Sequence, residues 1–314
     1  MDSLMHWLLR GVLGSIRFLP LTVVARIGRA CGMLAYLLDA RHRRVARRNL
    51  ALVFPTKSRQ EIRELARENF RRIGENFACA ARTFGMSDKE LERHLTCQAP
   101  ALHQSQEGRR RGTVVAIGHF GNFELLARIG HFVPGYRCGA TYRGLRQAAL
   151  NKLLQSLRGQ SGCVFFDRRF DSRALKEFMG KPDALLGLLA DQHAGDRGLE
   201  LPLFGHECST SAAPAVFALR YDCRLVTGFC FRTALGQWRL EASEEIATHE
   251  QGRPRSTREI MLDVNRSFEK AILRDPANWF WVHNRWKLKW KREGRPRGTP
   301  GFAERDRATL ATHP

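Results

Sequence analysis

Short apolar runs alternate with segments of helical periodicity between residue 113 and about residue 233. Residues 113–118, TVVAIG, form an apolar run typical of a buried strand, and after a turn at Gly121 the segment FELLA begins a helix-like pattern. The alternation continues, with strands expected at 138–142, 163–166, 184–191 and 225–232 and helices at 145–159, 172–180 and 211–221. Residues 238–242, WRLEA, are expected to form an antiparallel edge strand, and residues 256–274 a last long helix. Strands separated by helices predict an α/β fold with a mostly parallel central sheet flanked by helices.

Helical periodicity also dominates the first 84 residues. Residues 3–19 place six apolar side chains on one side and two arginines on the other, which predicts an N-terminal amphipathic helix. Such a helix can lie in a bilayer interface, and it can equally pack on the core of its own protein. A second helix is expected from residue 22 to about residue 39. A third is expected over 58–84, where Ser58 and Glu61 form a capping box.

The charge of the chain is strongly positive, with a formal net charge of +21. Residues 1–48 hold nine Arg against two Asp, and the basic segment 41–50 follows the second predicted helix directly. Such a balance favours partners that carry phosphate or carboxylate, namely nucleic acid, anionic lipid or an acidic carrier protein. A basic segment beside an apolar helix suits an anionic leaflet, at about 1 kcal/mol per basic residue. The alternative is a solvated helix face.

The N-terminal region shows no uninterrupted apolar run of membrane-spanning length. Its longest uncharged piece, 30–38, has nine residues, whereas a spanning helix needs ~20. No cleaved signal peptide is expected, because no basic residue precedes the first apolar stretch. The eight cysteines form no C-x-x-C pair and no zinc-type spacing, which indicates scattered core thiols in a reducing compartment.

Three regions are predicted along the chain. Residues 1–55 form an N-terminal amphipathic and basic arm that associates with a membrane, residues 56–293 an α/β catalytic domain, and residues 294–314 a basic, disordered tail. Residues 276–292 hold four Trp beside several Lys and Arg, which is the composition of an interfacial membrane anchor. Core tryptophans beside a solvated basic face would give the same composition, and Trp279 and Trp281 are expected in the core.

His119 and Glu124 are the first candidates for chemistry. His119 follows the predicted strand 113–118, and Glu124 lies in the first turn of the next helix. Loops at the carboxyl ends of parallel strands face a shared crevice. A neutral imidazole can take a proton at neutral pH, and an adjacent carboxylate fixes its tautomer. We therefore expect His119 to be a general base and Glu124 to orient it, although the spacing H-x4-E alone is a weak signal and a structural histidine is the alternative.

A second group of candidates follows the predicted strand 184–191, at the sheet end where His119 also lies. Asp191 is expected to orient an arginine or to shape a pocket, and Gln192 lies beside it. Asp191 and His193 are also plausible metal ligands, but nothing fixes a ligand spacing, so no metal or other cofactor is expected. Ser209 and Thr210 are expected to cap the helix at 211, although that helix N-terminus could equally bind phosphate.

Four blocks in register resemble one known family. They are GHFGNFELLA, TYRG at 141–144, LLADQHAGDRGLELPLFGHECSTSAAPA at 188–215 and NWFWVHNRWK at 278–287. Their order and spacing are similar to those of the bacterial lipid A late acyltransferases, the lauroyl and myristoyl acyltransferase group. The resemblance covers roughly residues 20–292, including RRVARRNLALVFP, and is far more specific than H-x4-E alone.

The resemblance implies a glycerolipid-acyltransferase-like α/β fold and an O-acyltransferase activity at the cytoplasmic face of the inner membrane. It implies His119 as general base, Glu124 as its orienting carboxylate, an acyl-carrier-protein thioester as donor and a lipid A precursor of the Kdo2-lipid IVA type as acceptor. Arg143 matches a family arginine expected near the acceptor phosphate or the oxyanion, as a guanidinium suits either. Asp191, Gln192 and Arg285 are expected to bind substrate.

Two alternatives remain open from the sequence. The same chemistry could act on another acceptor, such as a glycolipid, a phospholipid or an aminolipid. The charge alone would also fit a nucleic-acid-binding protein. However, no helix-turn-helix, zinc or RNP-type signature is present, so no nucleic acid is expected as a partner.

Overall fold

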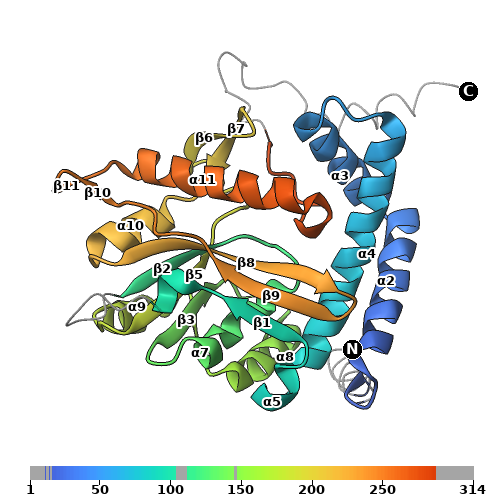
Figure 1. The fold of residues 1–314 in the computed structure, drawn as a ribbon, viewed down its shortest axis with the longest axis horizontal. Coiled ribbons are helices and arrows are strands. Elements are labelled where there is room, and N and C mark those ends of the chain that lie inside the picture. The colour runs from blue at the N-terminus through green and yellow to red at the C-terminus, as the bar shows by residue number, and fades with distance from the viewer. Residues whose placement is uncertain (1–10, 12–13, 15, 104–111, 145–146, 288–314) are drawn as a thin grey trace, which may run out of the picture.

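A seven-stranded sheet forms the centre of the molecule, with helices on both of its faces (Figure 1). The computed structural model describes residues 11, 14, 16–103, 112–144 and 147–287. The predicted amphipathic helix over 3–19 lies largely outside the described residues, and the predicted tail over 294–314 lies wholly outside them.

The strands of the sheet follow the order β1-β9-β8-β2-β5-β3-β4. They are β1 (Leu95–Gln98), β2 (Thr113–Ile117), β3 (Arg137–Tyr142), β4 (Val164–Asp167), β5 (Ala184–Leu189), β8 (Arg224–Ala234) and β9 (Gln237–Ala242). Every neighbouring pair is parallel except β8 and β9. The predicted α/β fold with a mostly parallel sheet is therefore confirmed. The central strands β2 and β5 are buried along almost their whole length, as expected for apolar runs covered on both faces.

Two local predictions are corrected by the structure. The antiparallel strand expected at 238–242 is present as β9, but β1 pairs with it in parallel, so β9 is not an edge strand. The short sequence LTCQ of β1 has no apolar run that could have marked it as a strand. The helix expected after Gly121 is a 3-10 helix, η1 (Phe123–Arg128), followed by a single α-turn, α7 (Ile129–Phe132).

Helices cover the two faces of the sheet. Figure 1 shows α10 (Ala213–Arg220) and α11 (Thr257–Arg274) above the sheet and α7 below it. Val264 and Phe268 of α11 share a core cluster with Val114 of β2, and α9 (Ser172–Met179) adds Met179 to it. On the other face, η1 and α7 pack on β2 and β5 in a second cluster, near α8 (Ala148–Arg158).

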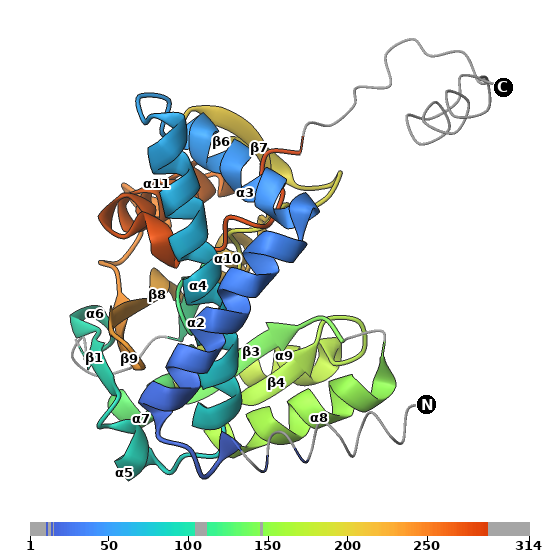
Figure 2. The ribbon, with the colours of Figure 1, turned by 90° about the vertical axis from the view of Figure 1, so that its right-hand side faces the viewer.

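A third group of helices stands beyond the carboxyl end of β8. It consists of α2 (Leu21–Leu38), α3 (Ala40–Val53) and α4 (Arg59–Thr83), with α2 lying against α4 in both ribbon views (Figures 1 and 2). The expected capping box of Ser58 and Glu61 begins α4. Gly28 and Gly32 of α2 meet Gly74 of α4 so closely that a Cβ on Gly32 would lie 2.1 Å from a backbone oxygen.

The helix α2 corrects the expectation that no segment reaches membrane-spanning length. By length and composition it could cross a bilayer, although core helices and signal sequences meet the same criterion. Counting uninterrupted uncharged residues missed it because Arg26 and Arg29 divide its sequence. Arg29 is paired with Glu68 and Glu75 of α4, so its charge is neutralised on the protein side of the helix. The boundary placed at residue 55 stays a prediction.

The remaining elements are short. A hairpin of β6 (Leu199–Leu203) and β7 (His206–Thr210) precedes α10, and the others are α5 (Asp88–Leu91), α6 (Pro100–His103), η2 (Gly159–Ser161), β10 (His249–Glu250), β11 (Arg253–Pro254) and η3 (Pro276–Asn278). The prediction that Ser209 and Thr210 cap α10 is wrong, because both belong to β7 and the N-cap position is Ala212. The hydroxyl of Ser209 instead donates to the Gly195 carbonyl at 2.5 Å.

Candidate active site

His119 lies two residues beyond β2, where the turn is fixed against the segment that follows α11. Phe120 forms an isolated antiparallel bridge with Trp279, and the N–H of Gly121 donates to the Asn278 carbonyl at 2.9 Å. Gly121 has a φ of 52°, and a Cβ on it would lie 2.4 Å from a backbone oxygen. Only glycine fits this turn, which therefore sets the position of His119.

The carboxylate that holds the His119 imidazole belongs to Asp191. Its Oδ1 lies 2.7 Å from His119 Nδ1, and its Oδ2 accepts the backbone N–H of His119 at 2.7 Å and the indole N–H of Trp279 at 2.8 Å. The register of the sheet explains the contact, because Ile117 of β2 lies opposite Leu189 of β5. His119 and Asp191 are each two residues further along their parallel strands.

Asp191 is only 2% exposed, yet it is held as an ionised carboxylate. Burial would raise its pKa, but the charge and hydrogen bonds of His119 and the hydrogen bond from Trp279 outweigh burial and bring the pKa below the ordinary value. An ionised acceptor at Nδ1 favours the tautomer with the proton on that nitrogen. His119 Nε2 is then the unprotonated nitrogen, and the side-chain amide N–H of Gln192 donates to it at 3.3 Å.

Glu124 does not make the contact expected of it. Its carboxylate binds Arg158 of α8 in a bidentate pair, with distances of 3.0 Å to Nε and 2.5 Å to Nη2. The expectation that Glu124 orients His119 is therefore corrected, because η1 directs its carboxylate toward α8 and Asp191 already occupies Nδ1. No local motif pointed to Arg158 as the partner of Glu124, because Arg158 lies 34 residues away on another helix.

Glu124 nevertheless lies at the junction of two cavities. It lines a small cavity of about 20 Å³ together with His119, Phe77 and Phe280, between α4 and the turn after β2. It also lines a larger, mainly apolar pocket of about 90 Å³ under η1. The Glu124–Arg158 pair therefore marks the polar boundary between the histidine and this pocket.

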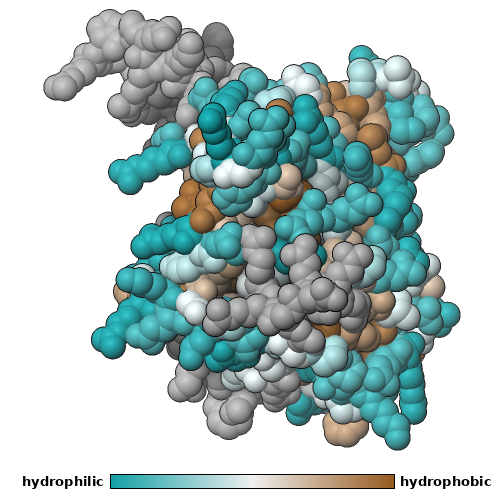
Figure 3. Space-filling view, turned by 60° about the vertical axis from the view of Figure 1, so that its left-hand side comes forward, coloured by the Kyte–Doolittle hydropathy of each residue, from teal (hydrophilic) through white to brown (hydrophobic). Residues whose placement is uncertain are grey.

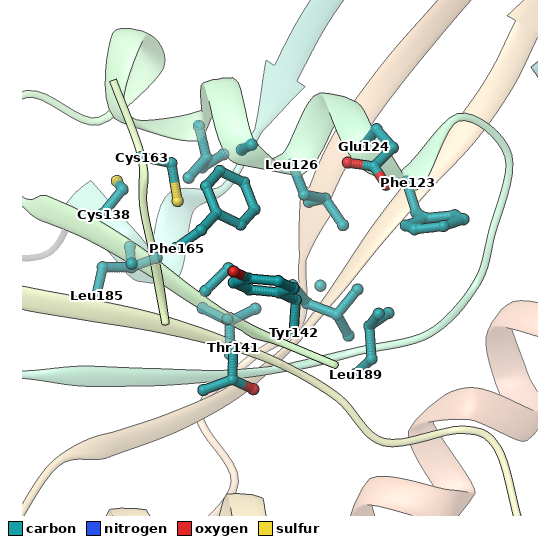
Figure 4. A pocket seen from close by; sticks show the side chains of 18 of the residues that line it. Phe123, Glu124, Leu126, Cys138, Thr141, Tyr142, Cys163, Phe165, Leu185 and Leu189 are labelled. Carbon is teal, nitrogen blue, oxygen red and sulfur yellow. The ribbon is translucent and has the colours of Figure 1, made fainter. Parts of the chain in front are cut away.

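The apolar pocket runs along one face of the sheet. In Figure 4 Phe123, Glu124 and Leu189 lie at one end, and Cys138 and Cys163 at the other. Phe165 and Tyr142 lie between the two ends (Figure 4). Burial raises the pKa of the Cys138 thiol to about 11, which suits a lining group without charge. A pocket lined mainly by apolar side chains can hold an unbranched hydrocarbon chain.

Small residues on the two strands that flank β2 make room for this pocket. Gly187 of β5 and Gly228 of β8 both line it. A Cβ on Gly187 would lie 2.7 Å from Ile117 Cδ1, and one on Gly228 would lie 2.6 Å from Val115 Cγ1. Larger residues at these two positions would displace the side chains of β2 and reduce the space on this face of the sheet.

Arg285 is not placed where a substrate could touch it, so its expected binding role is corrected. Its side chain is fully buried, and its guanidinium donates to the carbonyls of Ser209 and Gln192 and, at 2.8 Å, to Thr210 Oγ1. Burial lowers its pKa. The basic block around the C-terminal tryptophans is partly core, as Trp279 and Trp281 are 3% and 0% exposed, in agreement with prediction.

The other predicted residues lie around the His119–Asp191 pair in different ways. Gln192 is partly exposed beside the imidazole, whereas Arg143 is exposed just beyond β3. His193 contacts His283 rather than His119: its backbone N–H donates to His283 Nε2 at 3.0 Å. Within the part of the chain that the structure describes, no group of three His, Cys, Asp or Glu could hold a metal ion.

The site combines a histidine–carboxylate pair, whose side chains are 13% and 2% exposed, with a mainly apolar pocket, an arrangement that suits proton transfer beside an apolar substrate group. Comparison with known proteins agrees: residues 2–288 match the sequence model of the bacterial lipid A biosynthesis acyltransferases. The chain belongs to this family and is an acyltransferase.

The relatives with established names match over most of their length. The chain is 24% identical to the lipid A biosynthesis palmitoleoyltransferase of Escherichia coli K12, over 90% of this chain and 91% of the relative. It is 25% identical to the lauroyltransferase of the same strain, over 94% and 93%. A lipid A biosynthesis acyltransferase of Haemophilus influenzae is 24% identical over 91% of each chain.

Proposed function

We propose that this protein transfers a fatty acyl chain from an acyl-carrier-protein thioester to a hydroxyl of a lipid A precursor. The observation that carries the proposal is the position of the His119–Asp191 pair beside the polar boundary of the apolar pocket. A chain held in this pocket would present its thioester carbonyl near Glu124, beside the cavity that His119 lines. The relatives are named for lipid A biosynthesis, which supports the class of acceptor.

In the proposed reaction, the imidazole acts first as a base and then as an acid. His119 Nε2 takes the proton of the acceptor hydroxyl while Nδ1–H stays hydrogen-bonded to Asp191. The hydroxyl oxygen attacks the thioester carbonyl, and the tetrahedral intermediate collapses with loss of the carrier thiolate. The imidazolium returns its proton to that sulfur. Asp191, ionised throughout, stabilises the imidazolium formed between the two steps.

Two charged groups are proposed to assist this reaction from the rim of the site. Arg143 is exposed beyond β3, where it can meet an acceptor phosphate. We propose that it contacts this phosphate or the oxyanion. Glu124 is proposed to hold Arg158 at the mouth of the pocket, where the guanidinium also lies 5.1 Å from the ring centre of Phe165. This pair would separate the reacting carbonyl from the apolar chain.

The acceptor is a lipid, and the surface of the α2–α4 group offers it an approach. Large apolar side chains are exposed there, on α2 at Ile27, Leu34, Leu37 and Leu38, and on α4 at Phe77. Phe77 lies beside Phe280, whose ring centre is 5.9 Å from that of His119. The face on the side of α9 and α10 is by contrast mostly hydrophilic (Figure 3). We propose that the α2–α4 surface meets the cytoplasmic leaflet of the inner membrane.

Mass spectrometry of lipid extracts tests the proposal. Cells of a strain that lacks its own late acyltransferase would be compared with and without this protein, and with the His119→Ala variant. The expected result is lipid A heavier by one acyl chain only with the wild-type protein. An unchanged lipid A together with a heavier second lipid would instead assign another acceptor.

A further inference from the structure

An arginine-rich groove lies between α3 and the start of α4, outside the site described above. It has a volume of about 510 Å³ and is lined by nine residues: Ala40, Arg43, Arg44, Arg47, Arg48, Ala51, Lys57, Arg59 and Ile62. Those from α3 repeat the i, i+3, i+4 spacing of helical neighbours, so they occupy a single face of that helix. Six of the nine lining residues are Lys or Arg, and none is Asp or Glu.

Most of this positive charge has no acidic partner in the protein. Arg43 donates to the carbonyls of Tyr36 and Leu37, and Lys57 lies 3.6 Å from Glu61. Among the residues that the structure describes, no carboxylate lies within ion-pair distance of Arg44, Arg47 or Arg59. Like charges gathered in one groove repel each other, so an anion bound from outside the chain would stabilise the groove.

A short surface segment connects the groove with the active site. Arg48 at the groove donates to the side-chain oxygen of Asn284, and four residues earlier in the chain Phe280 lies against His119. Four residues span at most ~14 Å. Val282 and His283, between them, are partly exposed. An anionic partner seated in the groove could therefore reach His119 with a flexible arm laid along this segment.

We propose that the groove is the docking site of the acidic acyl carrier protein that delivers the acyl thioester. This inference rests on the proposed function, since it assigns a surface to the donor of that reaction. The row of cations on one face of α3 is complementary to a row of carboxylates on a projecting acidic helix. A concave groove receives such an element, whereas a flat bilayer would meet a flat or convex patch.

Charge reversal in the groove tests this docking. The variant Arg44→Glu/Arg47→Glu would be compared with wild type and with Arg173→Glu, an exposed arginine on α9 that serves as control. Two donors carry the same acyl chain: the acyl carrier protein, and acyl-pantetheine, which has the thioester arm without the acidic protein. Initial rates against donor concentration, with titration of the carrier onto each protein, would separate docking from chemistry.

The expected result is a KM for the carrier-bound donor raised about tenfold in the double variant, since each lost exposed ion pair contributes up to ~1 kcal/mol. The rate with acyl-pantetheine and the behaviour of Arg173→Glu should match wild type. An unchanged KM and affinity for the carrier would overturn the proposal. An equal loss of rate with both donors would also overturn it. If the double variant no longer floats with anionic phosphatidylglycerol vesicles but still binds the carrier, the groove would be assigned to lipid headgroups instead.

The proposed function can fail separately from the docking. If the wild-type protein acylates no lipid A precursor with either donor, the proposed reaction is wrong. The titration still tests whether the groove binds the carrier. Docking of an acidic carrier would be supported if the double variant loses specific carrier binding and Arg173→Glu keeps it. Absence of such binding would overturn the docking regardless of turnover.

Discussion

Asp191 Oδ1 lies 2.7 Å from Nδ1 of His119, across 72 residues of sequence. The two side chains meet because their strands, β2 and β5, are parallel neighbours in a register that places Ile117 opposite Leu189. Trp279 closes the arrangement by donating its indole N–H to the other carboxylate oxygen. A general base held in this way needs no contact from Glu124, the carboxylate that is nearest in sequence.

Replacing Asp191 by Asn should lower kcat by about 10³- to 10⁴-fold, as in other histidine–carboxylate sites where the amide favours the wrong tautomer. The KM values should change little, because Asp191 does not touch substrate in this account. Steady-state kinetics with purified protein would measure both. Nitrogen NMR of the His119 ring would show which ring nitrogen carries the proton, and so would distinguish a change of tautomer from a loss of folded structure.

The matched control for this variant is Glu124→Gln, which removes the charge that binds Arg158. Whatever its effect on turnover, it should leave the proton of His119 on Nδ1. A changed tautomer in Glu124→Gln with an unchanged one in Asp191→Asn would reverse the assignment of the orienting carboxylate.

The sequence was informative where a signal is local. Apolar runs located β2, β5 and β8, and the spacing of Ser58 and Glu61 located the start of α4. The site could be predicted only in part, because contacts between distant residues depend on strand order and register. His119 and Asp191 could both be placed at the carboxyl end of the sheet, but only the adjacency of β2 and β5 brings them together.

Arg285 shows a second limit of the sequence. Its neighbourhood, rich in tryptophan, lysine and arginine, has the composition of a membrane anchor, and the same composition also fits a core. The structure buries the Arg285 guanidinium against carbonyl groups of β7 and Gln192. Nothing local in the sequence distinguishes a guanidinium that binds substrate from one that holds a loop.

Filling the far end of the apolar pocket should shorten the acyl chain that the enzyme accepts. Cys163 lies at the end of the pocket remote from Glu124 (Figure 4), so Cys163→Phe would remove space for the terminal carbons. Competition between acyl donors of different lengths, with products weighed by mass spectrometry, would reveal the shift. Each excluded methylene corresponds to ~0.8 kcal/mol of lost burial, or about fourfold in preference.

The control for the pocket is Cys31→Phe, which places the same side chain on the exposed surface of α2. It should keep the chain-length preference of the wild type. Because an added ring can cost about 1–3 kcal/mol of stability, the unfolding temperature of Cys163→Phe must be measured as well. A folded Cys163→Phe protein with unchanged chain preference would exclude this pocket as the acyl site.

Replacing Arg285 by Lys should distinguish positioning from substrate binding. A lysine keeps the charge but cannot reach the carbonyls of Ser209 and Gln192 together, as the guanidinium does. The loop that carries Asp191 and Gln192 should then loosen, and kcat should fall by up to ~100-fold with little change in the acceptor KM. A raised acceptor KM at constant kcat would instead show that Arg285 contacts the substrate.

Acid should destabilise the protein through two histidines near the site. Burial lowers the pKa of both His193 and His283 below the usual 6.5, with nearby cations such as Arg285 contributing. In the unfolded chain both take up protons near pH 6.5, but in the folded protein only at lower pH. Stability should therefore be constant above about pH 6.5 and decline as the pH falls below it.

Thermal unfolding between pH 8 and pH 5 would measure this decline. The variant His283→Gln, whose amide oxygen can accept the backbone N–H of His193 in place of the imidazole, should show a smaller decline. Asp191 contributes in the same direction but at lower pH, since its pKa lies below the ordinary value of 3.8. An unfolding temperature that rises on acidification through pH 6 would contradict the assigned shifts.

The most direct test of the account is a reaction with purified components. Wild-type protein and His119→Ala would each be mixed with an acyl-carrier-protein thioester and a lipid A precursor, and the lipid product would be weighed by mass spectrometry. A precursor heavier by one acyl chain is expected with wild type and no such product with His119→Ala, at equal unfolding temperature. Acylation at the wild-type rate by His119→Ala would contradict the role of His119 as the general base.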